Sequence, residues 1–185
     1  MRYLLPLLFV ALTSSPSQTS SVGQSDAASD SSGGGGVAVT GSLAELKNRR
    51  RVLLLVRRSA VVDSRGGAEG LLKEAYAAAA AGAPLRYPRI YNLLAQQLNR
   101  YMNKYQSISA ARSVPDAEFI IFFNLLEYRR PLGHPYPYGE LFVILNDTAN
   151  GRRPRVIWKT RKSPVWVEDA VKDLLRDLRT VRGEG

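Results

Sequence analysis

The sequence predicts an α/β domain of the α+β type: a two-layer sandwich in which a mixed sheet of about four to five strands carries helices mainly on one face. Two short runs, 52–56 and 119–126, are apolar on both alternations, as expected of strands buried on both faces. Two stretches, 88–105 and 163–181, repeat apolar residues at helical spacing. An Asn-Gly turn signal at 150–151 lies between two further strand-like runs and predicts a β-hairpin.

The first half of the domain alternates strand and helix. The first strand is expected over 51–58, and an alanine-rich helix over about 68–81 is ended by Gly82 and Pro84. A stronger helix begins at Pro88, because proline is favoured in the first turn of a helix.

The second half is expected to hold the hairpin and the closing helix. The second central strand follows Pro115, and a short extra strand fits within 107–112. The hairpin arms are expected over 141–145 and 155–162, with one side of the second arm packed and the other partly in water. Strict alternation assigns Val156, Trp158 and Thr160 to one face, and Ile157, Lys159 and Arg161 to the other.

The amino-terminal part is expected to direct export. Residues 1–13 combine a basic start, an apolar run of about ten residues and small polar residues, which is the layout of a signal peptide. The run is well short of the roughly 20 residues needed to span a bilayer; its alternative is a buried element of the fold. Residues 14–48 are predicted to form a flexible Ser/Gly-rich linker before a single basic domain at 49–182. We therefore expect a periplasmic or extracellular protein that is soluble after cleavage.

Composition excludes several kinds of site. The chain has no cysteine and one histidine, which rules out disulfides, thiolate chemistry and histidine-cluster metal sites. We expect no cofactor and no metal. The formal net charge of +10 favours anionic partners such as an anionic polymer or lipid headgroups. Nucleic acid is disfavoured, because an exported protein meets little of it.

The carboxyl-terminal half resembles a known group of domains. An Ala-Glu-Phe-Ile-Ile-Phe strand precedes a hairpin and an amphipathic helix, and the hairpin carries Asp147, Gly151, Val156 and Trp158. This order resembles exported bacterial domains related to the curli-secretion lipoprotein and the amino-terminal domain of TolB. The resemblance implies protein contacts in the cell envelope and no catalytic residues. The chain lacks the amino-terminal cysteine of the lipoprotein members. We therefore expect it to be released rather than anchored to lipid.

Two surfaces are candidates for binding. The segment 129–139 contains three prolines and predicts a stiff ledge that offers aromatic and guanidinium groups to a partner, or else a plain connection. Its candidate contact residues are Arg129, Arg130, His134, Tyr136 and Tyr138. A second, basic cluster fits an anionic surface and comprises Arg152, Arg153, Arg155, Lys159, Arg161 and Lys162.

Catalytic groups are scarce. Of the two carboxylate pairs, Asp116 with Glu118 borders a strand, and Glu168 with Asp169 is better explained as a favourable charge at a helix start. The glycines at 66–70 lack the lysine of a phosphate-binding loop. We therefore favour a non-enzymatic envelope protein that binds another envelope protein. The alternatives are binding of an anionic polymer or membrane surface through the basic hairpin, and a hydrolase with an unrecognised carboxylate site.

Overall fold

The computed structural model describes residues 37–58, 67–80 and 87–185. The expected signal peptide and residues 14–36 of the expected linker lie outside this range. So do Gly66 and the expected end of the first helix at Gly82 and Pro84. The described part begins with a 3-10 turn, η1 (Leu43–Leu46), and continues with β1 (Arg51–Arg58), α1 (Gly67–Ala80) and α3 (Pro88–Tyr105). The remaining elements are β2 (Ser109–Ala110), β3 (Phe119–Arg129), the turn η3 (Pro131–Gly133), β4 (Tyr136–Leu145), the turn η4 (Thr148–Asn150), β5 (Arg155–Lys159), β6 (Val165–Trp166) and α4 (Val167–Arg182).

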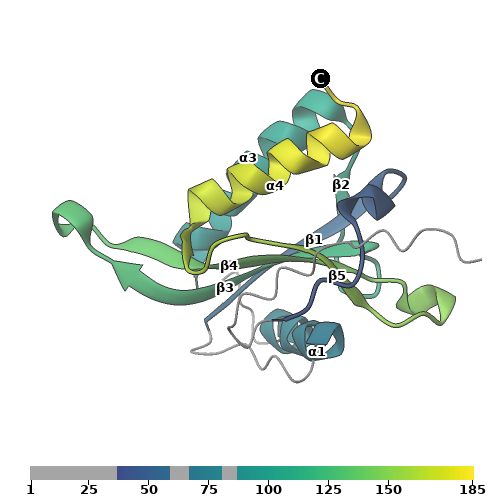
Figure 1. The fold of residues 1–185 in the computed structure, drawn as a ribbon, viewed down its shortest axis with the longest axis horizontal. Coiled ribbons are helices and arrows are strands. Elements are labelled where there is room, and N and C mark those ends of the chain that lie inside the picture. Colours follow the sequence, from purple (N-terminus) through teal and green to yellow (C-terminus); the bar gives the residue numbers. More distant parts are fainter. Residues whose placement is uncertain (1–36, 59–66, 81–86) are drawn as a thin grey trace, which may run out of the picture. The chain divides into compact units, whose positions relative to one another are not determined.

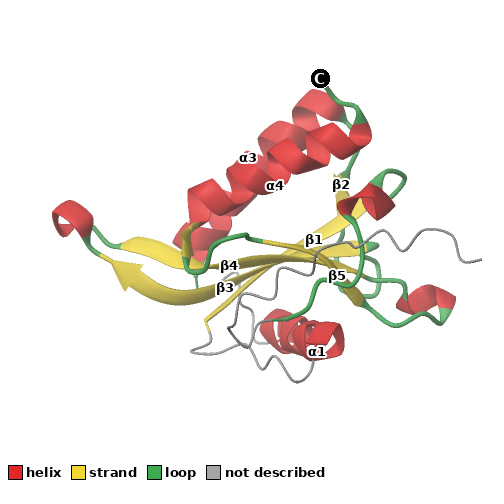
Figure 2. Ribbon diagram, in the orientation of Figure 1, coloured by secondary structure: helices red, strands yellow, loops and turns green. Residues whose placement is uncertain are grey.

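The strands form one mixed sheet in the order β2-β1-β3-β4-β5, and β6 pairs with β4. The strand β1 runs parallel to β2 and β3, whereas β3, β4 and β5 are antiparallel neighbours. The extra strand expected within 107–112 is present as β2. The sheet and its three helices confirm the predicted α/β class with a mixed sheet (Figure 2).

The helices lie on both sides of the sheet, with the two longer ones together on one face (Figure 1). Phe119, Ile121 and Phe123 of β3 point into the core beneath α3 and α4, while Ile120 and Phe122 point into a second core on the α1 side. Period-two alternation on a strand covered on both faces produces this division. It also explains why this segment of the sequence is apolar without interruption.

The expected alternation on β5 is wrong. Ile157 and Trp158 pack against the same core, on the α3 and α4 face, and only Val156 belongs to the other core. The register shifts between Val143 and Ile144, so that Val143 lies opposite Trp158 and Ile144 opposite Val156. A bulge of this kind adds one residue to one strand, and every later side chain then changes face.

The domain begins earlier than residue 49, so the linker boundary at 48 is also wrong. Val37, Leu43 and Leu46 are buried in the two cores. Ser42 caps the turn η1 in a reciprocal arrangement with Glu45, and the Thr40 N–H donates to the Val156 carbonyl at 2.9 Å. Residues 37–48 are therefore part of the folded unit.

Candidate binding groove at the base of the β3–β4 arm

The strands β3 and β4 extend past their neighbours as a two-stranded arm (Figure 1). The last residue of β3 paired with β1 is Leu125, yet β3 and β4 stay paired to Arg129 and Tyr136. On its other side, β4 is joined to β6 only at Tyr138 and Gly139. The segment 129–139 is thus mainly a hairpin end, and residues 136–139 are strand rather than loop, which corrects the expected ledge.

Gly139 fixes where the arm leaves the sheet. It lies opposite Leu125 on one side and Val165 on the other. A Cβ at this position would lie 2.1 Å from the Asn124 carbonyl oxygen and 2.9 Å from the Phe123 ring. The register of β3 against β4 shifts immediately beyond, between Leu125 and Glu127. Only glycine allows the backbones this close approach.

A groove of about 490 Å³ opens between the arm and the starts of α3 and α4. Its walls are mainly apolar and aromatic, and they also carry two arginines and one glutamate. The lining residues are Arg89, Ile90, Leu93, Tyr128, Arg130, Pro135, Tyr136, Pro137, Trp166 and Glu168. The Tyr136 and Trp166 rings meet edge to face at 5.6 Å between centroids, which holds both rings in place.

The five residues predicted as a contact site divide into two groups. Arg130 and Tyr136 line the groove. Arg129 and Tyr138 contact each other instead, with the Arg129 guanidinium 4.6 Å from the Tyr138 ring centroid and 2.6 Å from the Glu127 carboxylate. His134 is exposed and does not line the groove.

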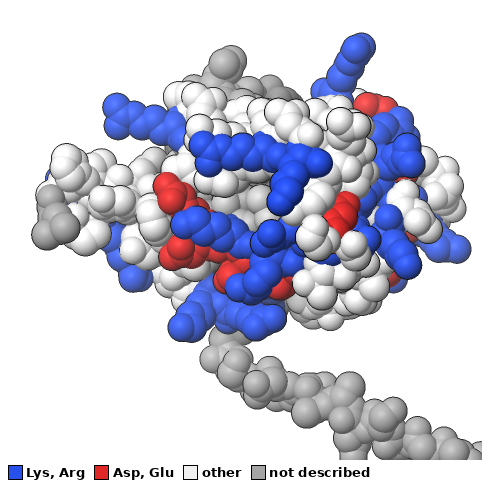
Figure 3. Space-filling view, turned by 90° about the horizontal axis from the view of Figure 1, so that it is seen from above, with Lys and Arg blue, Asp and Glu red and all other residues white. Residues whose placement is uncertain are grey.

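The basic cluster predicted to bind an anionic surface is largely engaged within the protein. Arg155 pairs with Glu45 at 2.6 Å, and Lys159 donates to the Val37 carbonyl at 3.1 Å. Weaker contacts join Arg153 to Glu69 at 3.5 Å and Arg161 to Asp177 at 4.0 Å. The side chains of Arg152 and Lys162 make no ion pair with a described residue. On the face seen from the α3 and α4 side, acidic side chains lie between the basic ones (Figure 3).

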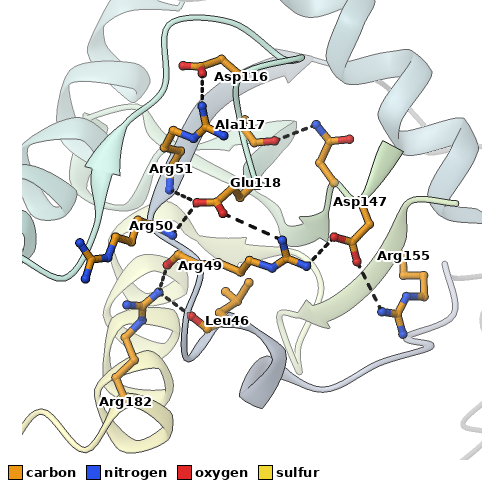
Figure 4. Close-up of polar contacts among 11 residues, drawn as sticks. Leu46, Arg49, Arg50, Arg51, Asp116, Ala117, Glu118, Asp147, Arg155 and Arg182 are labelled. Atoms are coloured by element: carbon orange, nitrogen blue, oxygen red, sulfur yellow. Dashed lines mark hydrogen bonds and ion pairs between the residues drawn. The ribbon is translucent and has the colours of Figure 1, made fainter. Parts of the chain in front are cut away.

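A separate charge network joins β1, β3 and the end of β4 (Figure 4). Asp147 is buried, with 2% of its side chain exposed, and lies 2.5 Å from the Arg49 guanidinium and 4.0 Å from that of Arg155. Arg49 is also 3.9 Å from Glu118. The two guanidiniums compensate the buried carboxylate within the fold, so we assign this network a structural role.

Glu118 closes the network at β1. Desolvation by itself raises the pKa of the Glu118 carboxyl, but hydrogen bonds from the Arg51 and Arg50 backbone N–H groups and the charges of Arg51 and Arg49 outweigh it. The pKa therefore lies below its ordinary value. Both backbone hydrogen bonds measure 2.8 Å.

The lowered pKa of Glu118 predicts that the fold loses stability in acid. Because the folded pKa lies below the unfolded one, the stabilisation is present above the ordinary pKa of a glutamate and is lost as pH falls through the folded pKa. In urea unfolding, Glu118→Gln is expected to be less stable than wild type at pH 7, with the difference shrinking toward pH 3. A difference that stays constant over this range would contradict the assignment.

Arg182, in the last turn of α4, reaches the segment before β1 (Figure 4). Its guanidinium donates to the carbonyls of Leu46, at 2.6 Å, and of Arg49. A third hydrogen bond, of 3.2 Å, goes to the Ser107 carbonyl. One side chain thus satisfies backbone acceptors from two segments that are far apart in the sequence.

Comparison with known proteins identifies no family. No protein-family model matches the chain, and no curated protein shows significant similarity to it. Among solved structures, the chain is similar to the PelC dodecamer from Paraburkholderia phytofirmans, with 11% identity, a TM-score of 0.33 and coverage of 78% of this chain and 94% of that one. A variant of the same dodecamer gives 13% identity, a TM-score of 0.34 and coverage of 80% and 95%. A similarity of this size carries no functional argument.

The four residues that carried the resemblance in the sequence have structural roles here. Asp147 forms the buried ion pair, and Gly151 adopts a left-handed conformation with φ of 67°. Val156 is fully buried, and the Trp158 indole N–H donates to Asp177 at 3.0 Å. They shape the hairpin and its contact with α4 without forming a surface site.

The groove residues outside the segment 129–139 carry no signal of a site in the sequence. Ile90 and Leu93 fit the core-facing stripe of their helix, and Trp166, a tryptophan beside a helix start, fits a position packed on the core. Glu168 lies in the first turn of α4, where a carboxylate is favourable, and it is also 3.8 Å from Lys172. Of the other carboxylates considered for catalysis, Asp116 pairs with Arg51 at 2.5 Å. Within the described residues, no three potential metal ligands gather.

Proposed function

We propose that this protein is exported and acts in the cell envelope as a non-enzymatic module that binds another protein through the β3–β4 arm and the groove at its base. The observation that carries the proposal is the groove itself. Aromatic rings, prolines and two arginines line it beside an arm whose outer part pairs with no further strand among the described residues. Tyrosine, tryptophan and arginine are the side chains that dominate protein interfaces.

The charge arrangement favours this role over binding of an anionic surface through β5. Four of the six basic side chains in the predicted cluster already contact carboxylates or a backbone carbonyl of the described residues.

None of the described helices is long and apolar enough to cross a membrane. The amino-terminal signal layout, together with the resemblance to envelope domains, supports export.

Site-specific photo-crosslinking in cells tests the proposal. A photoreactive phenylalanine analogue in place of Tyr128, which is 45% exposed on the arm, is expected to give a discrete protein adduct in the envelope fraction. The same analogue in place of Tyr76, 42% exposed on α1, is the matched control and is expected to give none. Equal adducts from both positions, no adduct from position 128, or recovery of the protein only in the cytoplasm would each contradict the proposal.

A further inference from the structure

The groove continues as a polar hollow along α3. Leu93 and Glu168 line both parts. In the second part, four side-chain amides follow one stripe of the helix at spacings of four, three and four residues: Asn92, Gln96, Asn99 and Asn103. All four are exposed, and none of their amides hydrogen-bonds to another described residue. Each offers a donor and an acceptor, the same pair that a peptide bond presents.

The two parts of the groove carry unbalanced positive charge. Arg89 and Arg130 line the apolar part, and Arg100 lines the polar part. None of the three forms an ion pair with a carboxylate of the described residues. The one acidic lining residue, Glu168, is already 3.8 Å from Lys172. Positive charge that is not balanced within a groove favours a ligand with negative charge.

The apolar part is suited to one large side chain. The rings of Tyr136 and Trp166 and the side chains of Ile90 and Leu93 form its walls. The Trp166 indole nitrogen is shielded from solvent and has no hydrogen-bond partner among the residues that the structure describes. A polar group shielded in this way is costly unless an acceptor reaches it.

We propose that this groove binds an extended, acidic segment of a partner protein. One large apolar side chain of the segment fills the space beside Tyr136 and Trp166, and its carboxylates pair with Arg89 and Arg130. The backbone of the segment follows the amides of α3, which pair with its peptide groups. This inference rests on the proposed function and names the chemistry of the partner.

Selection from a library of random twelve-residue peptides displayed on phage tests the partner's chemistry without knowledge of its identity. Selection on the purified protein, with counter-selection on its Leu93→Lys variant, is expected to enrich peptides that combine net negative charge with an aromatic or large aliphatic residue. Failure to enrich any peptide, or enrichment of neutral or basic peptides, would overturn the inference. The photo-crosslinking result in cells would stand independently, so loss of the inference is distinguishable from loss of the proposed function.

Charge reversal then locates the binding. By fluorescence anisotropy, Arg89→Glu/Arg130→Glu is expected to weaken binding of an enriched peptide at least tenfold. The control Arg152→Glu/Lys162→Glu makes the same change in net charge outside the groove and is expected to change binding less than twofold. Equal losses of affinity in the two variants would mean non-specific binding of anions. Displacement of the peptide by polyglutamate, which lacks an apolar residue, as readily as by the unlabelled peptide would mean the same. Either result would refute the groove as the binding site.

Discussion

Replacing Gly139 by alanine is expected to lower the free energy of unfolding by about 3 kcal/mol, because overpacking against backbone usually costs about 1–3 kcal/mol and here the strands cannot separate without losing their register. The added Cβ would lie 2.1 Å from the Asn124 carbonyl oxygen, which belongs to the neighbouring strand and not to a flexible side chain. Relief would require β4 to move away from β3 at the base of the arm.

Chemical denaturation followed by far-UV circular dichroism measures this loss. Gly185→Ala is the matched control, because a Cβ at that position meets nothing within 4 Å, and it is expected to change stability by less than about 0.5 kcal/mol. A Gly139→Ala protein as stable as wild type would show that the two strands are farther apart than described.

Asp147→Asn is the second substitution with a large expected effect: we expect it to lower the free energy of unfolding by about 2–4 kcal/mol. Removing one member of a buried ion pair leaves the other charge without compensation, which typically costs about 3–5 kcal/mol. We expect a somewhat smaller loss here because water still reaches both arginines: 27% of the Arg49 side chain and 35% of the Arg155 side chain are exposed. The amide preserves the shape of the side chain, so the loss reports mainly on charge.

Thermal and urea unfolding of the variant, compared with Asp169→Asn, tests this expectation. The Asp169 side chain is 57% exposed and lies 4.0 Å from Lys172, so its neutralisation is expected to cost less than about 1 kcal/mol. In a double-mutant cycle, Arg49→Met is expected to cost clearly less in the Asp147→Asn background than in wild type. Additive losses would mean that the two side chains do not interact.

The sequence predicted the central part of the fold because its strongest signals are continuous. The apolar runs that became β1 and β3, and the helical periodicity that became α3 and α4, needed no tertiary information. The bulge in the β4–β5 pair could not be predicted, since one additional residue leaves no mark on composition. The early start of the domain was obscured because Leu43 and Leu46 are isolated apolar residues in a polar segment.

The start of β4 shows a second limit of predicting the fold from the sequence. Pro137 suggested a loop, because proline cannot donate to a strand ladder. It is tolerated in β4 because it lies opposite Tyr128 on the arm, beyond the pairing of β6, which reaches only Tyr138 and Gly139. Prolines within sheets are confined to such edge positions. The arm was therefore predicted as an irregular ledge.

The candidate groove could be predicted only in part, since it assembles residues from three separate segments. Arg130 and Tyr136 were found because a proline-rich stretch with aromatic and basic residues stands out in any sequence. Arg89 and Leu93 carry no such mark, because they fit an ordinary amphipathic helix. Their position opposite the arm depends on how α3 packs on the sheet, which only the structure shows.

The contacts of Arg182 bear on the order in which the protein is made and folds. Leu46 and Arg49 precede Arg182 by 136 and 133 residues, so the segment before β1 is synthesised long before the guanidinium that binds its carbonyls. Nascent chains that stop short of residue 182 leave those acceptors without this partner. The amino-terminal segment of the domain therefore completes these hydrogen bonds only once α4 is in place.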